Sequence, residues 1–212
     1  MKSRKEAGAP PSGSGMVGGV ILAAGESSRM GRRKAFLRHD GTGTTFLAHL
    51  VREAAAAGLS PILVVGRPGD VDLERAVVEV GATYVPNPRA DAGQLFSILA
   101  GLDQLTPAAS GVVVMPVDVP LVSARVLQRL VRAAQDQGVG IARATHAGKH
   151  GHPVLFTRSV FDELRCADPA VGARAVVGAD LRRLRDVEVD EPGVTVDIDT
   201  PDDYFRAFGR RL

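Results

Sequence analysis

The chain of 212 residues is long enough for one domain with a hydrophobic core, and its 45% hydrophobic and 24% charged residues are typical of a globular protein. A net charge of +2 and a 4% aromatic share without tryptophan give no reason to expect a nucleic-acid partner. No apolar stretch approaches the roughly 20 residues that span a bilayer, and the single cysteine, Cys166, excludes an internal disulfide or a thiolate-rich metal site. We therefore expect a cytoplasmic protein with no membrane association, in which Cys166 packs in a helix.

The N-terminal residues 1–15 are charged and rich in Pro, Ser and Gly, and they contain no hydrophobic signal core. They predict a disordered tail, and residues 16–212 predict a single domain. The pattern G-x-G-x-x-G occurs at Gly13–Gly18. A dinucleotide fingerprint follows a strand and opens a helix, whereas this pattern precedes the first predicted strand, so we do not interpret it as an NAD site.

The first predicted strand leads into a loop with the chemistry of a phosphate site. Val20–Leu22 predicts a buried strand, and the small residues Ala23–Gly25 allow a ligand to lie against the main chain. Gly25 can also adopt a positive φ without steric cost. Arg29 and Lys34 then supply fixed positive charge for phosphate oxygens. The stretch therefore predicts a triphosphate-binding loop, although it lacks the P-loop signature, and an ordinary turn with a solvated basic face is the alternative.

Helical and strand patterns then alternate along the chain. The predicted helices are Phe46–Ala57, Val71–Val80, Gln94–Leu105 and one that begins near Ser123. The predicted strands are Pro61–Gly66, Ala82–Val85 and Gly111–Val117. This alternation predicts an α/β protein with a three-layer, Rossmann-like fold and a mostly parallel central sheet.

In such sheets ligands bind beyond the carboxyl ends of the strands. Asn87–Arg89 follows the third predicted strand, and Asp118 follows the fourth, between Pro116 and Pro120. An acidic residue at the tip of a hydrophobic strand suits Mg²⁺, which takes carboxylate oxygens and bridges substrate phosphates. The alternative is that Asp118 only caps the helix near Ser123.

The second half of the chain is less regular. The basic tract from Arg143 to His150 precedes the strand-like Val154–Phe156, which predicts an insertion or a hairpin near the mouth of the site. His150 and His152 form a weak zinc signal because no third ligand lies at a sensible spacing.

Apolar and acidic residues alternate near the C-terminus, and a helix should begin at Pro201. The period-two alternation predicts an extended segment in which Asp197 and Asp199 share one face. Either carboxylate could join Asp118 around one metal ion.

The chain resembles the molybdenum cofactor cytidylyltransferases, which are related to the guanylyl-transferring enzymes. The resemblance spans about residues 17–208 and rests on these motifs, in order: LAAGESSRMGRRK, NPRADAGQLFSILAGL, PVDVPLV, GHPVLF and DIDTPDDY. It implies a Mg²⁺-dependent nucleotidyltransferase, with Mn²⁺ as an alternative metal, that transfers CMP from CTP to the terminal phosphate of the molybdopterin cofactor. The further partner that it implies is a molybdenum hydroxylase client protein.

The resemblance also assigns roles to residues. Arg29, Lys34 and Asp118 would be catalytic, and Asp118 and Asp199 would hold the metal. The implied nucleotide-binding residues are Leu22, Ala23, Ala24, Gly25, Arg29, Lys34, Asn87, Gly93, Ser97 and Pro116. Ala24 favours CTP, because the guanylyl-transferring relatives usually have glycine there, and a methyl group is worth about 1–3 kcal/mol of discrimination.

Two departures from the family pattern concern the acceptor side. Arg38 stands where relatives often have proline, and Asp168–Arg174 keeps only the Gly-Ala-Arg part of the usual segment. GTP as the donor, or another phosphate acceptor, are therefore alternatives. Two alternatives belong to other classes: an NAD(P)H-dependent reductase resembling nicotine blue reductase, and a cofactor-carrying chaperone without turnover.

Overall fold

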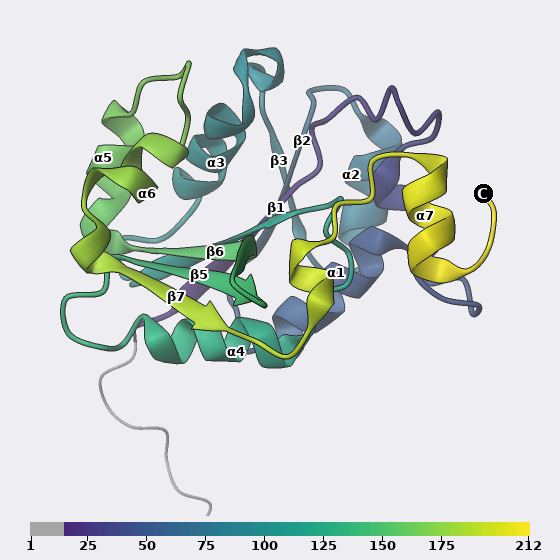
Figure 1. Ribbon diagram of the computed structural model, residues 1–212. Coiled ribbons are helices and arrows are strands. Elements are labelled where there is room, and N and C mark those ends of the chain that lie inside the picture. Colours follow the sequence, from purple (N-terminus) through teal and green to yellow (C-terminus); the bar gives the residue numbers. More distant parts are fainter. Residues whose placement is uncertain (1–14) are drawn as a thin grey trace, which may run out of the picture.

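The computed structural model describes residues 15–212, which form an α/β fold around one seven-stranded sheet (Figure 1). The strands are β1 (Val17–Leu22), β2 (Ile62–Gly66), β3 (Thr83–Pro86), β4 (Gly111–Pro116), β5 (Ile141–His146), β6 (Lys149–Thr157) and β7 (Leu184–Glu188). The α-helices are α1 (Phe46–Ala56), α2 (Val71–Glu79), α3 (Gln94–Leu102), α4 (Ala124–Ala133), α5 (Phe161–Cys166), α6 (Arg174–Ala179) and α7 (Pro201–Phe208). Short 3-10 turns occur at Lys34–Phe36, Ala90–Ala92, Arg158–Val160, Leu181–Arg183 and Pro192–Thr195.

The strand order is β3-β2-β1-β4-β6-β5-β7. The pairs among β3, β2, β1 and β4 are parallel, β6 runs antiparallel to both β4 and β5, and β7 is parallel to β5. The predicted mostly parallel sheet is therefore confirmed. The predicted hairpin is also confirmed, as β5 and β6, and its turn uses positive φ at Ala147 (50°) and Gly148 (74°).

Helices cover both faces of the sheet (Figure 1). Side chains such as Ile21 and Val113 pack against α1, α2, α4 and α7, while their strand neighbours Val20 and Val114 pack against α3, α5 and α6. This division follows from the alternation of side chains along a strand. The three-layer arrangement predicted from the sequence is confirmed.

The first strand begins earlier than predicted, at Val17 instead of Val20. Gly18 lies within it, and an added Cβ there would come 2.5 Å from Leu105 Cδ2, so this glycine allows close packing against the segment after α3. The described part of the glycine pattern therefore leads into a strand instead of a phosphate-binding turn. Residues 1–14, with most of the predicted disordered tail, lie outside the described residues.

The segment before α7 differs from the prediction. Pro192–Thr195 is a 3-10 turn, and residues 196–199 join no sheet, so only part of the alternating stretch is outside a turn and none of it is a strand. Ile198 N instead donates to Asp118 O at 2.8 Å, which holds this segment against the end of β4. Helix α7 begins at Pro201 as predicted, with a capping box between Thr200 and Asp203.

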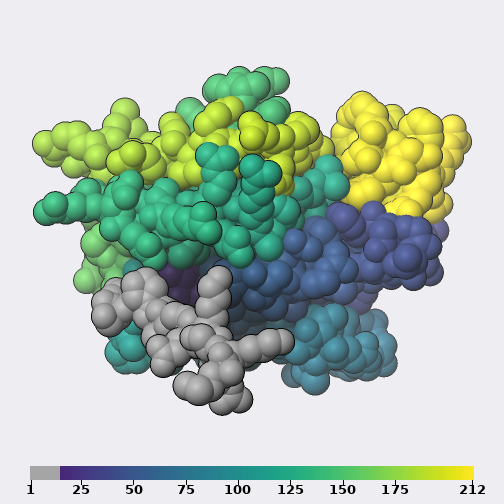
Figure 2. Space-filling view, turned by 90° about the horizontal axis from the view of Figure 1, so that it is seen from below, coloured from purple at the N-terminus to yellow at the C-terminus, as the bar shows by residue number. Residues whose placement is uncertain are grey.

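The C-terminal segment lies at one end of the molecule, beside residues from the first fifth of the chain (Figure 2). Tyr204 of α7 is buried, and its hydroxyl donates to Arg38 O at 2.8 Å. Cys166, in contrast, is exposed at the end of α5, so its predicted packing role is wrong. Among residues 15–212 the structure contains no helix that is both long and apolar enough to cross a bilayer.

Candidate active site

The loop after β1 extends along the sheet edge before it turns. Ala23 N still donates to Val65 O at 2.9 Å, and the left-handed conformations that close the loop belong to Ser27 (φ 53°) and Gly31 (φ 68°). Gly25 could adopt a positive φ without steric cost, but it is not in the left-handed region. A Cβ added at Gly25 would nevertheless meet no atom within 4 Å. Its missing side chain therefore leaves open space beside the main chain, as a close-lying ligand requires.

Lys34 lies at the centre of a charge cluster. Its side chain is only 11% exposed, and Nζ donates to Asp118 Oδ2 at 2.9 Å and to Asp199 Oδ1 at 2.5 Å. Arg29, with a 70% exposed side chain, donates to Asp199 Oδ2 at 2.9 Å. The structure thus brings together the predicted catalytic and metal residues from three distant segments. We call these four side chains the charge cluster.

The charge cluster shifts the pKa values of its own members. Burial disfavours the Lys34 ammonium, but the hydrogen bonds to Asp199 and Asp118 outweigh this effect and raise the pKa of Lys34. The hydrogen bond from Lys34 lowers the pKa of Asp199. Both groups therefore carry their charges throughout the neutral range.

Asp197 and Asp199 differ in their surroundings, although the sequence did not separate them. Asp199 contacts both cations of the charge cluster, whereas burial and the negative charge of Asp118 raise the pKa of Asp197. The carboxylate that contacts the cations of the loop is therefore Asp199. Asp118 does not cap α4, because Ser123 does so with its own hydroxyl, which corrects the alternative interpretation of Asp118.

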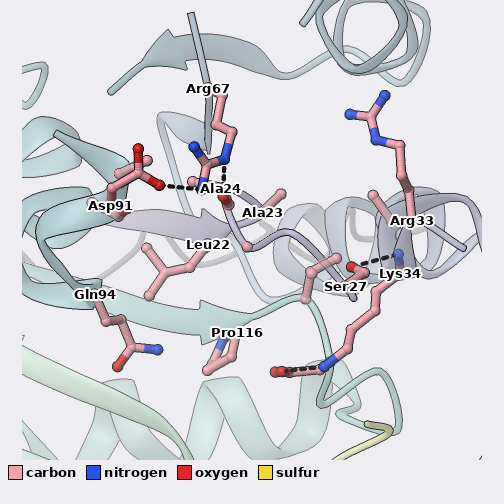
Figure 3. Close-up of a pocket in the computed structure, with 16 residues that line it drawn as sticks. Leu22, Ala23, Ala24, Ser27, Arg33, Lys34, Arg67, Asp91, Gln94 and Pro116 are labelled. Atoms are coloured by element: carbon pink, nitrogen blue, oxygen red, sulfur yellow. Dashed lines mark hydrogen bonds and ion pairs between the residues drawn. The ribbon is translucent and has the colours of Figure 1, made fainter. Parts of the chain in front are cut away.

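Beside the charge cluster lies a cavity of about 380 Å³, which we call the nucleotide pocket (Figure 3). Its lining includes seven predicted nucleotide-binding residues: Leu22, Ala23, Ala24, Gly25, Lys34, Ser97 and Pro116. Asp118 also lines it, whereas the predicted residues Arg29, Asn87 and Gly93 are not among the lining residues.

Asn87 does not line the nucleotide pocket but contacts Ser97, which does. The side chain is buried, and its Nδ2 donates to Ser97 Oγ at 2.9 Å while its Oδ1 accepts from Arg89 N at 2.9 Å. Both contacts lie within the protein, so Asn87 orients Ser97. Gly93 is the residue before α3 and has a φ of 111°, a conformation that favours glycine.

Sequence reasoning missed Arg67, which follows β2 directly. Its Nε donates to Ala24 O at 3.0 Å, and its terminal nitrogen donates to Asp91 Oδ1 at 2.6 Å. The hydrogen bond from Arg67 lowers the pKa of Asp91. The signal was available, because a residue that follows a parallel strand reaches the same sheet edge as the phosphate loop. Ser27, which the sequence also placed in the phosphate-binding loop, lines the pocket as well. The other lining residues that were missed are Arg33, Ala35, Ala90, Asp91, Gln94 and Val117.

The charge cluster also fits a divalent metal ion. Asp118 and Asp199 are hard oxygen donors, they converge on one ammonium, and their side chains are about 30% exposed. Within residues 15–212 no group of three or more His, Cys, Asp and Glu side chains is placed to hold a metal. The two carboxylates therefore suit an ion that takes its remaining ligands from phosphate and water, as Mg²⁺ and Mn²⁺ do.

Known proteins are similar to this chain in sequence and in fold. Residues 19–188 match the family model of the MobA-like NTP transferase domain. The purine catabolism protein PucB of Bacillus subtilis (strain 168) is 29% identical over 199 residues, which are 88% of this chain and 93% of PucB. A probable molybdenum cofactor guanylyltransferase of Opitutus terrae is 36% identical over 120 residues, which are 56% of each chain.

Solved structures are also similar to this chain. The crystal structure of Rv0371c from Mycobacterium tuberculosis H37Rv is 30% identical with a TM-score of 0.78, and the match covers 93% of this chain and 100% of that one. A crystal structure of Rv0371c in complex with manganese is 28% identical with a TM-score of 0.74 and covers 92% of this chain and 98% of that one. The chain therefore belongs to the family of MobA-like NTP transferase domains and is a nucleotidyltransferase of that family.

Proposed function

We propose that this protein transfers CMP from CTP to the terminal phosphate of the molybdopterin form of the molybdenum cofactor, with release of pyrophosphate. The observation that carries the proposal is the charge cluster beside the nucleotide pocket, where Lys34 contacts both Asp118 and Asp199. This arrangement offers fixed positive charge and metal-binding oxygens to a triphosphate.

The reaction needs positioning and charge neutralisation more than a protein nucleophile. An oxygen of the acceptor phosphate forms a bond to the α-phosphorus of the nucleotide. The bond from the α-phosphorus to the oxygen that bridges to the β-phosphorus breaks, and pyrophosphate leaves with that electron pair. Lys34 and Arg29 stabilise the negative charge that the phosphate oxygens carry, and the open main chain at Gly25 lets the phosphates approach closely.

Asp118 and Asp199 would hold the Mg²⁺ ion, with Mn²⁺ as an alternative. A bound divalent ion would neutralise charge on the phosphate oxygens and on the leaving pyrophosphate. The structure of Rv0371c in complex with manganese supports the use of a divalent metal.

The base preference rests on Ala24, whose side chain is buried in the lining of the nucleotide pocket. Its carbonyl oxygen accepts the hydrogen bond from Arg67 Nε at 3.0 Å. This contact fixes the main chain, so the methyl group cannot move away from a larger base, and the smaller base of CTP is favoured. GTP is the second candidate, because the relative from Opitutus terrae is described as a guanylyltransferase.

The test is pyrophosphate release with Mg²⁺ and each of CTP, GTP, ATP and UTP, with and without the cofactor, for the native chain and Asp118→Asn. We expect cofactor-dependent release that is fastest with CTP and is lost in the variant. Release that is fastest with GTP would move the proposal to guanylyl transfer. If none of the four nucleotides gave pyrophosphate release, the proposed reaction would be refuted.

A further inference from the structure

A basic cavity of about 740 Å³ lies between the end of the phosphate loop and the C-terminal segment that follows α7. We call it the arginine cavity, because its lining includes Arg32, Arg33, Arg38, Arg210 and Arg211. The only acidic side chain in its described lining is Asp40. The carboxylate of Asp40 accepts hydrogen bonds from Thr42 N at 2.9 Å and from Thr44 N at 3.0 Å, so its own turn already engages it. The arginine cavity therefore carries a large excess of positive charge.

Most of these guanidinium groups have no acidic partner in the described part of the chain. Among residues 15–212, the only ion pair that a lining residue of the arginine cavity forms joins Arg33 to Asp70. Several like charges in one cavity repel one another. A bound anion would relieve this repulsion, so the composition of the cavity favours an anionic ligand.

Neutral groups hold Arg210 in place. Its Nε donates to the Tyr204 hydroxyl at 3.0 Å, and a terminal nitrogen donates to Arg38 O at 2.9 Å. The guanidinium carbon also lies 5.9 Å from the ring centroid of Tyr204 and 5.6 Å from that of Phe208. A guanidinium has five N–H donors, so these contacts leave donors of Arg210 available to a ligand. The position of this cation is therefore fixed while its charge is not neutralised.

Arg38 lies against the turn that follows it. A Cβ added at Gly43 would come 3.0 Å from Arg38 Nη1, and Gly43 has a φ of 100°, a conformation that favours glycine. The glycine therefore leaves room for the guanidinium beside the main chain. Because Arg210 donates to the Arg38 carbonyl, the two arginines also belong to one connected wall. Groups that are already held in place lose less freedom when a ligand binds.

A polyphosphate fits these features better than other anions do. The planar fork of a guanidinium matches phosphate oxygens in bidentate pairs. A single phosphate can engage one or two such forks, whereas a chain of linked phosphoryl groups can reach several. An acidic peptide usually binds in an extended groove or along a sheet edge, but this site is a concavity of the size that small molecules occupy.

The arginine cavity is connected to the nucleotide pocket through the phosphate loop. Arg33 lines both, and Phe36, which ends the 3-10 turn that begins at Lys34, lines the arginine cavity. In Figure 3, the side chains of Arg33 and Lys34 extend in different directions, and that of Lys34 points toward Asp118. An anion that holds Arg33 in the arginine cavity would therefore remove positive charge from the nucleotide pocket.

We propose that the arginine cavity binds a polyphosphate chain, either free pyrophosphate or the chain of a nucleotide, and that its occupation weakens the binding of CTP in the nucleotide pocket. The second part of this inference rests on the proposed function. Arg33 can meet the phosphates of only one ligand at a time, and two polyanions on either side of one loop repel each other. The coupling between the two sites is therefore negative, and it is reciprocal.

Calorimetric titration of the native chain without a metal ion tests the binding. Pyrophosphate, ADP, inorganic phosphate and an octaglutamate peptide are titrated separately. We expect pyrophosphate and ADP to bind at least about tenfold more tightly than inorganic phosphate and the peptide, because linked phosphoryl groups reach more than one guanidinium. Tighter binding of ADP than of pyrophosphate would assign the chain to a nucleotide, and equal binding would assign the site to the phosphoryl groups alone.

Variants separate the arginine cavity from the nucleotide pocket, which would also bind pyrophosphate as a product. The double variant Arg38→Gln with Arg211→Gln should weaken pyrophosphate about 30-fold at the arginine cavity, and both residues are exposed, so the fold should persist. Lys34→Gln alters the nucleotide pocket and should leave this binding intact. Arg132→Gln is the matched control, because Arg132 is an exposed arginine in the last turn of α4, outside the arginine cavity. It should leave the affinity unchanged.

The coupling is measured by the transfer of a label from the α-phosphate of CTP to the cofactor. At saturating pyrophosphate, the KM for CTP should rise about fivefold more in the native chain than in the double variant. An equal rise in the two proteins would contradict the proposed coupling, because the competition would then occur in the nucleotide pocket alone.

Three results would overturn the proposed site. Inorganic phosphate or the acidic peptide could bind as tightly as pyrophosphate, the double variant could bind pyrophosphate as tightly as the native chain, or Lys34→Gln could abolish the binding. The titrations contain neither CTP nor the cofactor, so their failure is distinct from a failure of nucleotidyl transfer.

Discussion

The nucleotide pocket adjoins a second cavity of about 320 Å³, which lies between α3, β6 and the segment before α6 and shares Gln94 with it, but the two differ in what forms them. In the nucleotide pocket, charged side chains from distant segments hold one another in place, and Lys34 alone joins Asp118 to Asp199. In the second cavity, an apolar floor gives the shape, and Arg174 forms no ion pair with another described residue. The nucleotide pocket therefore relies on a few preorganised charges, whereas the second cavity relies on the shape of its apolar walls.

The largest effect should follow the loss of the central cation of the nucleotide pocket. Lys34→Gln removes the charge that contacts both carboxylates, and we expect kcat/KM for nucleotidyl transfer to fall by about 10³-fold. Steady-state pyrophosphate release measures this loss, and circular dichroism checks that the variant is folded. If the loss stayed below tenfold while the fold was intact, the charge cluster would not be the catalytic centre.

The stacked histidines His39 and His49 should make the free energy of unfolding depend on pH. His49 stacks on His39 with ring centroids 3.6 Å apart, and burial lowers the pKa of His39 and lowers that of His49 to about 4. The neutral rings are favoured in the folded state, so their contribution is complete above the unfolded pKa of about 6.5 and is lost as the pH falls from there toward 4. The pair packs against α7, which follows the segment that carries Asp199.

We expect the free energy of unfolding to drop by about 3 kcal/mol across this interval because of His49. Urea unfolding at several pH values measures the drop. Carboxylates titrate in the same range, so His49→Gln serves as the comparison and should show a shallower pH dependence. Parallel curves for the two proteins would contradict the assigned role of His49.

A matched pair of substitutions distinguishes the two acidic residues before α7. Asp199→Asn should weaken Mn²⁺ binding and lower kcat by about 100-fold, because Asp199 is the ionised carboxylate in the charge cluster. Asp197→Asn should change both by less than about fivefold, since Asp118 and Asp199 are the carboxylates that contact Lys34, while burial and the charge of Asp118 raise the pKa of Asp197. Calorimetric titration with Mn²⁺ measures the difference, and the reverse ranking would assign the metal to Asp197.

The smallest effect concerns the choice of base. Ala24→Gly removes one methyl group from the lining of the nucleotide pocket and should move the ratio of kcat/KM for CTP over GTP toward GTP by about tenfold. Competition between the two nucleotides in one reaction measures this ratio. Ala35→Gly, at another small lining residue, is the control and should leave the ratio unchanged. An unchanged ratio in Ala24→Gly would remove the structural reason for preferring CTP.

The sequence predicted the parts of the site that follow directly from the order of strands and loops. Lys34 and Asp118 were found because charged residues after buried strands collect at one edge of a parallel sheet. Arg67 obeys the same rule and was overlooked, since a single arginine after β2 forms no motif by itself. Its contacts to Ala24 and Asp91 join segments that only the folded chain brings together.

Side-chain direction and irregular backbone were harder to predict. Asn87 was assigned to the nucleotide, but its side chain turns into the protein and bonds Ser97, which depends on packing beneath the pocket. The alternation around Asp197 and Asp199 predicted that the two carboxylates share one face, but an extended segment has the same period whether or not it joins a sheet, so the pattern could not show that this segment joins none. The second cavity forms between α3, β6 and the chain before α6, so no local pattern reveals it.

We propose that the protein transfers a nucleotidyl group from a nucleotide in the nucleotide pocket to a phosphate acceptor. The most direct measurement incubates the protein with Mg²⁺, the molybdopterin cofactor and CTP that carries a radioactive label in its α-phosphate, and then follows the label. We expect the label to appear on the cofactor with release of one pyrophosphate for each CMP transferred, and Lys34→Gln to abolish the transfer. Label that remains in CTP or appears only in free CMP, for this nucleotide and for labelled GTP, would contradict it.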